Sequence, residues 1–372
     1  MLNNVHGLIF THNRTYNLRE LTEPRCLSSV PFGGRFRMID FMVSNMVNAG
    51  IPDVGVILQA RYQSLLDHLG SGKDWDLARH TGGMRLLPPY SLPTQKIHGA
   101  SRGQMDVLAG MEPYLQDIRQ DYVFLADGDI VVNLPLQDVY QRHIDSGADI
   151  TLVCTQKYTG DPAASVYFAV NDAQEITDVI SRPKHPTGME FLNLFLLSKE
   201  LLIHLTQYCA THTLYSIRDD LLPRIQNQYK LVPYVFDGFS TRCTSVSSYY
   251  DNSMTLLDPA VRRELFRPDS PIRTRDRNEP STYYAPGSSC RNSLVAGGCI
   301  IEGSVENSII FQNVSIEKGA RVKNCILFKG THVEAGADLS QVITDKGVTI
   351  TSDTALTGAP HYPLVIAKGS RV

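Results

Sequence analysis

Short apolar runs alternate with amphipathic stretches through the larger, N-terminal part of the chain. Residues 39–49 and 62–69 have the apolar spacing of helices. Around such helices lie runs with the length and composition of buried strands, at 7–10, 54–58, 122–126 and 150–154. Strands separated by helices predict a mostly parallel sheet covered on both faces. Because ligands of such sheets bind beyond the carboxyl ends of the strands, chemistry is expected after Phe10, Leu58 and Ala126.

The pattern changes after residue 240. Residues 245–266 have helical spacing, and residues 268–286 are rich in Pro, Arg, Ser and Tyr, which predicts a surface connector. Farther along, apolar residues recur at intervals of 11, 6, 11 and 6, at Val305, Ile316, Val322, Val333 and Leu339. This near-hexapeptide spacing predicts a left-handed parallel β-helix, whose triangular coils stack one apolar residue per face. An antiparallel sandwich with regular turns is the alternative.

These changes divide the chain into three parts. Residues 1–240 form the predicted α/β domain, and residues 241–286 form a helical segment and connector. Residues 287–372 form the predicted β-helix domain. Chemistry is therefore sought in the first part, while the exposed coil ends and faces of the last part favour oligomerisation.

Composition narrows the class of protein. The 372 residues are 42% hydrophobic and 20% charged, as in soluble globular proteins, and the net charge of -3 provides no basic footprint for nucleic acid or a membrane surface. No apolar run approaches the roughly 20 residues that span a bilayer, and the first residues lack the features of a signal peptide. The seven cysteines are scattered without a C-x-x-C pair, which favours reduced, buried thiols in a cytoplasmic protein.

Three segments carry a resemblance to a known family. Residues 30–45, V-P-F-G-G-R-F-R-M-I-D-F-M-V-S-N, are similar to the signature near the start of ADP-glucose pyrophosphorylases, which are glucose-1-phosphate adenylyltransferases. Residues 292–305 resemble the first coil of that family's C-terminal β-helix, and residues 271–274 resemble its connector. The resemblance covers nearly the whole chain. It implies a Rossmann-like nucleotidyltransferase domain with a mostly parallel sheet, followed by the left-handed β-helix.

The family's reaction implies what its site must contain. ATP and glucose 1-phosphate give ADP-glucose and pyrophosphate through direct attack of the sugar phosphate on the α-phosphorus. Catalysis is mainly positioning and neutralisation of charge by Mg²⁺ and basic side chains. The family therefore carries a glycine-rich phosphate loop after the first strand and a lysine soon after it. Here residues 12–17 contain no glycine, and Leu27 stands at the position of the lysine.

The metal-binding positions of the family are altered as well. Two aspartates hold Mg²⁺ there, since this hard cation prefers carboxylate oxygens. Matching residues 127–130 to the family's G-D-H-I step puts Gly128 at the first position, and Arg242 falls at the second. A cation in place of a metal ligand repels Mg²⁺ directly. Asp127 and Asp129 are weak candidates for metal binding in a shifted register, and the alternative is that they cap the turn.

Other positions keep residue types that bind ligands. Arg182 replaces the lysine of the family's sugar-phosphate step and is a candidate for holding a phosphate, with a salt bridge to a neighbouring carboxylate as the alternative. Gln59, Gly103 and Asp106 match family positions beside the nucleotide. They indicate either the remnant of a nucleotide site or maintenance of the fold.

A separate group of arginines suggests regulation. Arg35 matches the basic residue with which members of the family grip activator phosphates near the β-helix junction. Arg37 and Arg273 are predicted to lie close by and are further effector candidates. The alternative is that these arginines form interface contacts or surface salt bridges.

The losses coincide on phosphate- and metal-binding positions, whereas the scaffold segments are kept. This pattern resembles the GlgD-type second subunit that accompanies a GlgC-type catalytic subunit in some Gram-positive bacteria. It implies a non-catalytic or weakly catalytic regulatory subunit in glycogen synthesis, in a heterotetramer with the GlgC-type partner. The chain would need no cofactor itself, Mg²⁺ would serve the partner's reaction, and a phosphorylated metabolite would be the effector. Two alternatives stay open: a weak but genuine adenylyltransferase, and a sugar-phosphate or nucleotide sensor without a catalytic partner.

Overall fold

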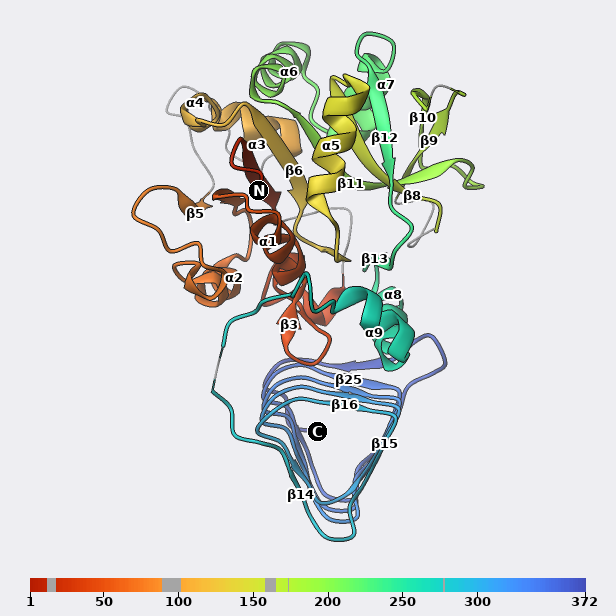
Figure 1. Cartoon of the computed structure of the whole chain (residues 1–372). Helices are drawn as coiled ribbons and strands as arrows, with labels where there is room; N and C mark the ends of the chain where they lie inside the picture. The colour runs from red at the N-terminus through yellow and green to blue at the C-terminus, as the bar shows by residue number, and fades with distance from the viewer. Residues whose placement is uncertain (12–17, 89–101, 158–164, 173, 277) are drawn as a thin grey trace.

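The computed structural model contains an α/β domain and, beneath it, a triangular prism of coils (Figure 1). It describes residues 1–11, 18–88, 102–157, 165–172, 174–276 and 278–372. No helix within these ranges is long and apolar enough to cross a membrane. All seven cysteines lie in the described ranges as free thiols, and each of them except Cys290 is buried.

A mixed sheet forms the centre of the α/β domain. Its parallel half contains, in spatial order, β6 (Tyr122–Asp127), β1 (Val5–Phe10), β4 (Asp53–Ile57) and β5 (Gly83–Leu87). The long strand β11 (Met189–Ser198) lies antiparallel to β6. Beyond it are β8 (Ile150–Thr155), β9 (Val166–Val170), β10 (Ile176–Ser181) and β12 (Leu231–Val235). Every residue of β1 is buried because the strand lies at the centre of a sheet covered on both faces.

Helices cover both faces of the sheet and enclose separate hydrophobic cores. The core on one face is formed with α3 (Gln104–Gly110), α4 (Glu112–Asp117), α6 (Lys199–His212) and α7 (Leu222–Ile225). The core on the other face is formed with α1 (Met38–Asn48), α2 (Gln63–Leu69) and α5 (Leu136–Ser146). Single helical turns lie at η1 (Arg19–Leu21), η2 (Leu27–Ser29), η3 (Lys73–Trp75) and η5 (Ile217–Leu221). The predicted layered α/β domain is confirmed.

Two small ribbons and a helical segment lie between the sheet and the prism. Strand β7 (Ile130–Val132) pairs antiparallel with β13 (Ser240–Arg242), and β2 (Pro31–Phe32) pairs with β3 (Phe36–Arg37). The chain then continues through α8 (Val246–Met254), η6 (Thr255–Leu257) and α9 (Pro259–Leu265). The connector that follows is held on the α/β domain, because Asn133 donates to Ser270 O at 2.8 Å and Arg273 N donates to Ser44 Oγ at 2.8 Å.

The prism consists of three parallel sheets, one for each face. The first contains β14 (Tyr283–Tyr284), β17 (Ile300–Ile301), β20 (Ser315–Ile316), β23 (His332–Val333) and β26 (Thr349–Ile350). The second contains β15 (Ser289–Arg291), β18 (Ser304–Glu306), β21 (Arg321–Lys323), β24 (Asp338–Ser340) and β27 (Ala355–Thr357). The third contains β16 (Leu294–Val295), β19 (Ile309–Ile310), β22 (Ile326–Leu327), β25 (Val342–Thr344) and β28 (Leu364–Ile366). The regularly spaced apolar residues that predicted a β-helix are buried inside it, and that prediction is confirmed.

A third hydrophobic core joins the two units. Ile309, Ile326 and Ile343 come from successive coils of the third sheet and share this core with residues of the α/β domain such as Phe32 and Tyr249. Figure 1 shows this face of the prism, with β16 and β25, turned toward the α/β domain. The apolar surfaces of the two units therefore pack directly against each other at their junction.

Candidate functional site

Strand β6 ends in Asp127, a buried carboxylate with donors on both of its oxygens. Gln104 from α3 donates Nε2 to Oδ1 at 2.9 Å. Asn193 from β11 donates Nδ2 to Oδ2 at 2.7 Å. The backbone of Asn193 is left-handed, with φ 55°, a conformation that asparagine adopts more readily than most residues. Helix α3 and two neighbouring strands therefore converge on one carboxylate at the carboxyl end of the sheet.

Arg242 supplies the cation at this carboxylate. Its Nη2 lies 3.4 Å from Asp127 Oδ2 and donates to Leu192 O at 3.2 Å. Its Nε lies 4.0 Å from Asp129 Oδ1. The pairing of β13 with β7 sets Arg242 opposite Ile130 and so beside the aspartates. All three charged side chains are buried, so their attraction is screened little by salt.

Asp129 is buried beside this pair and has fewer hydrogen-bond partners than Asp127. Neither carboxylate oxygen accepts a hydrogen bond from another residue in the part of the chain that the structure describes. Burial raises the pKa of Asp129 to about 6, although the Arg242 guanidinium opposes that shift. The Asp127 carboxylate raises the pKa as well, since two negative charges this close repel each other.

The described residues here do not fit Mg²⁺. A magnesium ion needs oxygen ligands in near-octahedral geometry, whereas the oxygens of Asp127 already hold two amide donors and face a guanidinium. Gly128 offers no ligand, and a Cβ added there would lie 3.0 Å from Ile9 Cγ2 and 3.1 Å from Ser28 Oγ. An aspartate at position 128 would require its neighbours to move.

Leu27, at the position of the family's lysine, belongs to the core between the two units. Its side chain is 3% exposed and lies in η2 among the apolar residues of that core. The leucine therefore contributes packing at the domain junction in place of a charge. The glycine-free segment 12–17 lies outside the described residues.

Arg182 stands at the carboxyl end of β10 and is paired within the chain. Its Nη2 lies 3.0 Å from Asp219 Oδ2, and both side chains are partly exposed. Because the pair is exposed, it is worth little in stability and leaves the guanidinium accessible. The geometry agrees with the salt-bridge interpretation and leaves phosphate binding untested.

The residues that match nucleotide positions have local partners. A Cβ at Gly103 would collide with Tyr215 O, so glycine is required for the backbone to approach this closely. Arg102 donates from its backbone to Asp106 Oδ2 at 3.0 Å and from Nη2 to Oδ1 at 3.2 Å. Gln59 is half-buried just beyond the end of β4. The contacts of Gly103 and Asp106 organise the start of α3, a role that requires no ligand.

Basic side chains gather at the junction of the α/β domain and the prism. Arg35 is exposed on the turn between β2 and β3, above a shallow cavity also lined by Arg275, Lys329 and Lys346. Lys329 donates to Glu279 at 2.7 Å. The cluster brings together cations that are remote in sequence, and Arg275, Lys329 and Lys346 had no motif to mark them beforehand.

The other two arginines predicted near Arg35 are placed differently. Arg37 lines the same cavity but is buried, and its Nη1 donates to Ser29 Oγ at 2.5 Å and to Ser64 Oγ at 2.9 Å. Arg273 lies on the connector and does not line this cavity. Of the predicted group, Arg35 is therefore the exposed member of the cluster.

Gln104 and Asn193 were not among the candidate residues that the sequence indicated. Nothing in the sequence indicated that both would donate to the same carboxylate, because they lie far apart along the chain.

Comparisons with known proteins agree with this architecture. A family model described as nucleotidyl transferase matches residues 14–257, and a GlmU-like C-terminal hexapeptide model matches residues 284–360. A "Glycogen biosynthesis protein GlgD" of Bacillus subtilis is 36% identical over 99% of this chain and 96% of its own length. A protein with the same description from Geobacillus stearothermophilus is 32% identical over 87% of this chain and 84% of its own length. A "Glucose-1-phosphate adenylyltransferase" from the latter organism is 32% identical over 82% of this chain and 79% of its own length.

Proposed function

This chain belongs to the glucose-1-phosphate adenylyltransferase family of nucleotidyl transferases, and from that premise we propose that it is a regulatory subunit of glycogen synthesis. It has no competent catalysis of its own and acts in the cytoplasm beside a GlgC-type catalytic partner, in a heterotetramer. The family's reaction, formation of ADP-glucose and pyrophosphate from ATP and glucose 1-phosphate, is carried out by the partner with Mg²⁺.

The observation that carries this proposal is that the carboxylate at the end of β6 already has partners within the chain on both of its oxygens. Asp127 is the charged group best placed to hold a metal at this edge, and Gln104, Asn193 and Arg242 occupy it. Admitting Mg²⁺ would require Arg242 to leave, because two cations in a buried site repel strongly. The exchange of a lysine for the buried Leu27 removes a second charge that the reaction would use.

A regulatory subunit must respond to something and transmit the response. The cations around Arg35 suit a phosphorylated effector, because guanidinium and ammonium groups form charge-assisted hydrogen bonds to phosphate oxygens. They lie where the α/β domain meets the prism, so a ligand bridging both units would favour one relative placement of the two. A subunit interface would then pass that preference to the partner as a coupling free energy.

The test measures ADP-glucose synthesis by this chain alone, by a purified GlgC-type subunit alone and by their mixture, with Mg²⁺ and excess substrates. We expect no turnover from this chain alone and a mixture that exceeds the GlgC-type subunit. Turnover by this chain alone on the order of 1 per second, an ordinary enzymatic rate, would contradict the proposal and favour a genuine adenylyltransferase. A mixture equal to the GlgC-type subunit, with no complex on size-exclusion chromatography, would contradict the regulatory role and favour a sensor.

A further inference from the structure

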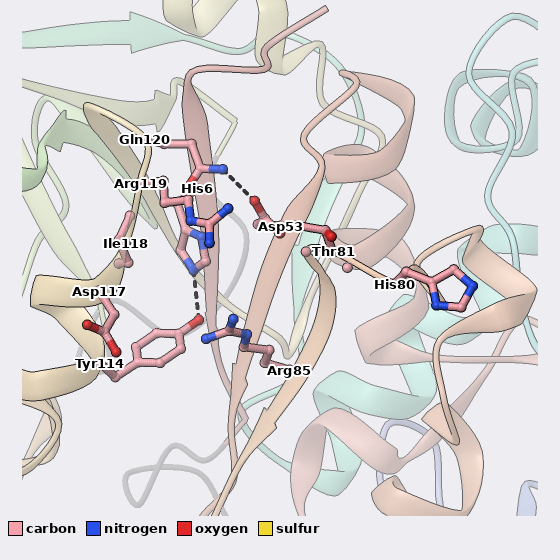
Figure 2. A pocket seen from close by; sticks show the side chains of 12 residues that line it. His6, Asp53, His80, Thr81, Arg85, Tyr114, Asp117, Ile118, Arg119 and Gln120 are labelled. Atoms are coloured by element: carbon pink, nitrogen blue, oxygen red, sulfur yellow. Dashed lines mark hydrogen bonds between the residues drawn. The ribbon is translucent and has the colours of Figure 1, made fainter.

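A polar cavity opens at the edge of the sheet opposite Asp127. It lies at the amino ends of β1 and β4, and its volume is about 530 Å³, within the range of small-molecule sites. Figure 2 shows the side chains that line it. They come from these two strands, from β5 with the loop before it, and from α4 with the segment that follows it. None of these residues belongs to the site at the end of β6 or to the cluster around Arg35.

The strands place polar residues here on a face that is otherwise apolar. Side chains alternate along a strand, so His6 shares a face with Leu8, and Arg85 shares a face with Leu87. The leucines pack in the core beneath α3 and α4. His6 and Asp53 are register partners on adjacent strands, so they lie side by side. Such polar groups cost stability unless they find partners.

His6 is the buried member of this set, and its bonding is incomplete. Its side chain is 5% exposed, and its Nε2 lies 2.9 Å from the Tyr114 hydroxyl. Its Nδ1 has no hydrogen-bond partner in the part of the chain that the structure describes. Burial lowers the pKa of His6 to about 4, so the ring is neutral near pH 7 and adds no charge to the cavity wall.

The position of the Tyr114 side chain depends on a glycine of the sheet. A Cβ at Gly55 would lie 2.5 Å from the Tyr114 hydroxyl oxygen, so any larger residue at position 55 would push this tyrosine away from His6. The tyrosine thereby forms a fixed wall, and its hydroxyl orients the imidazole.

Two arginines at the same cavity have unused hydrogen-bonding capacity. Arg85 from β5 and Arg119 from the segment after α4 are both exposed, and within the described ranges neither makes a hydrogen bond or ion pair. Arg85 lies 6.0 Å from the centre of the Tyr114 ring. A pair of free guanidinium forks is the usual protein match for an oxyanion such as phosphate or carboxylate.

A carboxylate and an amide also line the cavity. Gln120 donates Nε2 to Asp53 Oδ2 at 2.5 Å, as Figure 2 shows. Asp117 is exposed at the rim. These carboxylates would repel a plain anion, but they are good acceptors for hydroxyl donors, which form strong charge-assisted hydrogen bonds to carboxylates.

We propose that this cavity binds a small phosphorylated polyol, with the phosphate on Arg85 and Arg119 and the hydroxyls on Asp53. The ligand provides acceptors for both exposed arginines at once. Its hydroxyl groups donate hydrogen bonds to the nearby carboxylates, which would repel an anion without such donors. The carboxylates therefore select a sugar phosphate over inorganic phosphate. Binding is a property of this chain alone, so it does not depend on a catalytic partner.

The experiment is isothermal titration calorimetry of the full chain with glucose 6-phosphate, ribose 5-phosphate, inorganic phosphate and glucose. We expect saturable binding of at least one sugar phosphate, weaker binding of inorganic phosphate and none of glucose. Arg85→Ala and Arg119→Ala should each weaken binding about tenfold, as expected for loss of a charged hydrogen bond. Both side chains are exposed, so these variants should fold normally, as circular dichroism will confirm.

Matched variants separate this cavity from the other basic sites. Arg321→Ala changes an exposed arginine of the prism and should not alter the affinity. Arg35→Ala and Arg182→Ala change the other phosphate candidates, so binding at this cavity is the part that persists in these variants. Asp53→Asn should reduce the preference for a sugar phosphate over inorganic phosphate. No binding of any of the four probes at millimolar concentration would overturn the proposal, as would binding that survives Arg85→Ala and Arg119→Ala. Neither result would touch the regulatory role, which is measured with the partner.

Discussion

At the residue scale, Asp127, Asp129 and Arg242 form a buried group of two acids and one base. Arg242 lies nearer to Asp127, at 3.4 Å, than to Asp129, at 4.0 Å, and only Asp127 also accepts amide hydrogen bonds in the described part of the chain. The single guanidinium therefore stabilises the negative charge of Asp127 more than that of Asp129. The less favoured carboxylate has the raised pKa, as expected when burial outweighs a distant counter-charge.

This inequality makes the stability of the protein depend on pH through Asp129. Its folded-state pKa of about 6 lies above the ordinary value of 3.8, so between these values the folded state binds the extra proton. Its contribution to stability must fall as pH rises through this window, with a slope of up to about 1.4 kcal/mol per pH unit. Asp129→Asn removes the effect, so the variant should gain stability relative to the wild type from pH 4 to pH 6 and stay level above that.

Urea unfolding at several pH values measures this difference. The wild-type curve alone is insufficient because His6, whose pKa is lowered to about 4, contributes the opposite slope: its contribution to stability is lost as pH falls from 6.5 toward 4. Asp338→Asn, at an exposed position of the prism, is the control and should change stability by less than about 0.5 kcal/mol at each pH. A constant difference between Asp129→Asn and the wild type from pH 4 to pH 7 would show that the carboxyl does not titrate in this window.

At the scale of elements, the junction between the α/β domain and the prism contains a buried ion pair within an apolar core. Arg25 Nη2 donates to both oxygens of Asp345, at 2.9 and 3.0 Å, and the side chains are 2% and 0% exposed. Arg25 also donates Nη1 to Leu21 O at 3.1 Å. The pair joins the segment before η2 to the loop after β25, residues 320 positions apart.

Removing one member of this pair should be costly. Arg25→Ala leaves the Asp345 carboxylate buried and uncompensated, so we expect a loss of about 3–5 kcal/mol in the free energy of unfolding. The double variant Arg25→Met with Asp345→Leu replaces the pair by apolar groups and should recover most of the loss. Chemical denaturation followed by far-UV circular dichroism measures both.

An exposed pair of the prism is the matched control. Lys323 and Glu306 lie 3.6 Å apart with 54% and 39% of their side chains exposed, so Lys323→Ala should cost at most about 1 kcal/mol. If Arg25→Ala costs no more than Lys323→Ala, the buried pair does not hold the junction, and the apolar core alone does.

At the scale of the whole molecule, the junction is also where the proposed effector cations gather. Arg35 belongs to the α/β domain, whereas Lys329 and Lys346 belong to the prism, so a bound phosphate would contact both units. Arg35→Ala should therefore weaken the response of the mixed enzyme to phosphorylated effectors while leaving its activity without effector unchanged. The expected change is about tenfold in the effector concentration that gives half of the response, from one charged hydrogen bond.

The measurement compares effector titrations of mixtures that contain wild-type chain, Arg35→Ala or Arg321→Ala. Arg321 is exposed on the prism and does not line the cavity, so its variant should respond as the wild type does. An unchanged effector response with Arg35→Ala would assign this cluster to interface or surface contacts instead.

Periodic features of the chain were determined by the sequence alone. Strands such as 122–126 follow from continuous apolar runs, which indicate a strand buried on both faces. Coils that contain Val322 and Val333 follow from local spacing, because the near-hexapeptide period fixes which side chains face inward. The replacements at Leu27, Gly128 and Arg242 were also visible, because long scaffold segments secure the register on either side. The family followed from the same segments, and comparison with relatives confirms it.

Only the tertiary structure decided what those replacements do. That Gln104, Asn193 and Arg242 meet at Asp127 depends on α3, β11 and β13 being brought to one end of β6. The cavity around His6 likewise depends on β1, β4, β5 and α4 lying together. Hydrogen bonds and charge interactions act over a few ångströms in space, whereas these residues are separated along the chain by tens to more than a hundred positions, and spacing in sequence carries no record of that proximity.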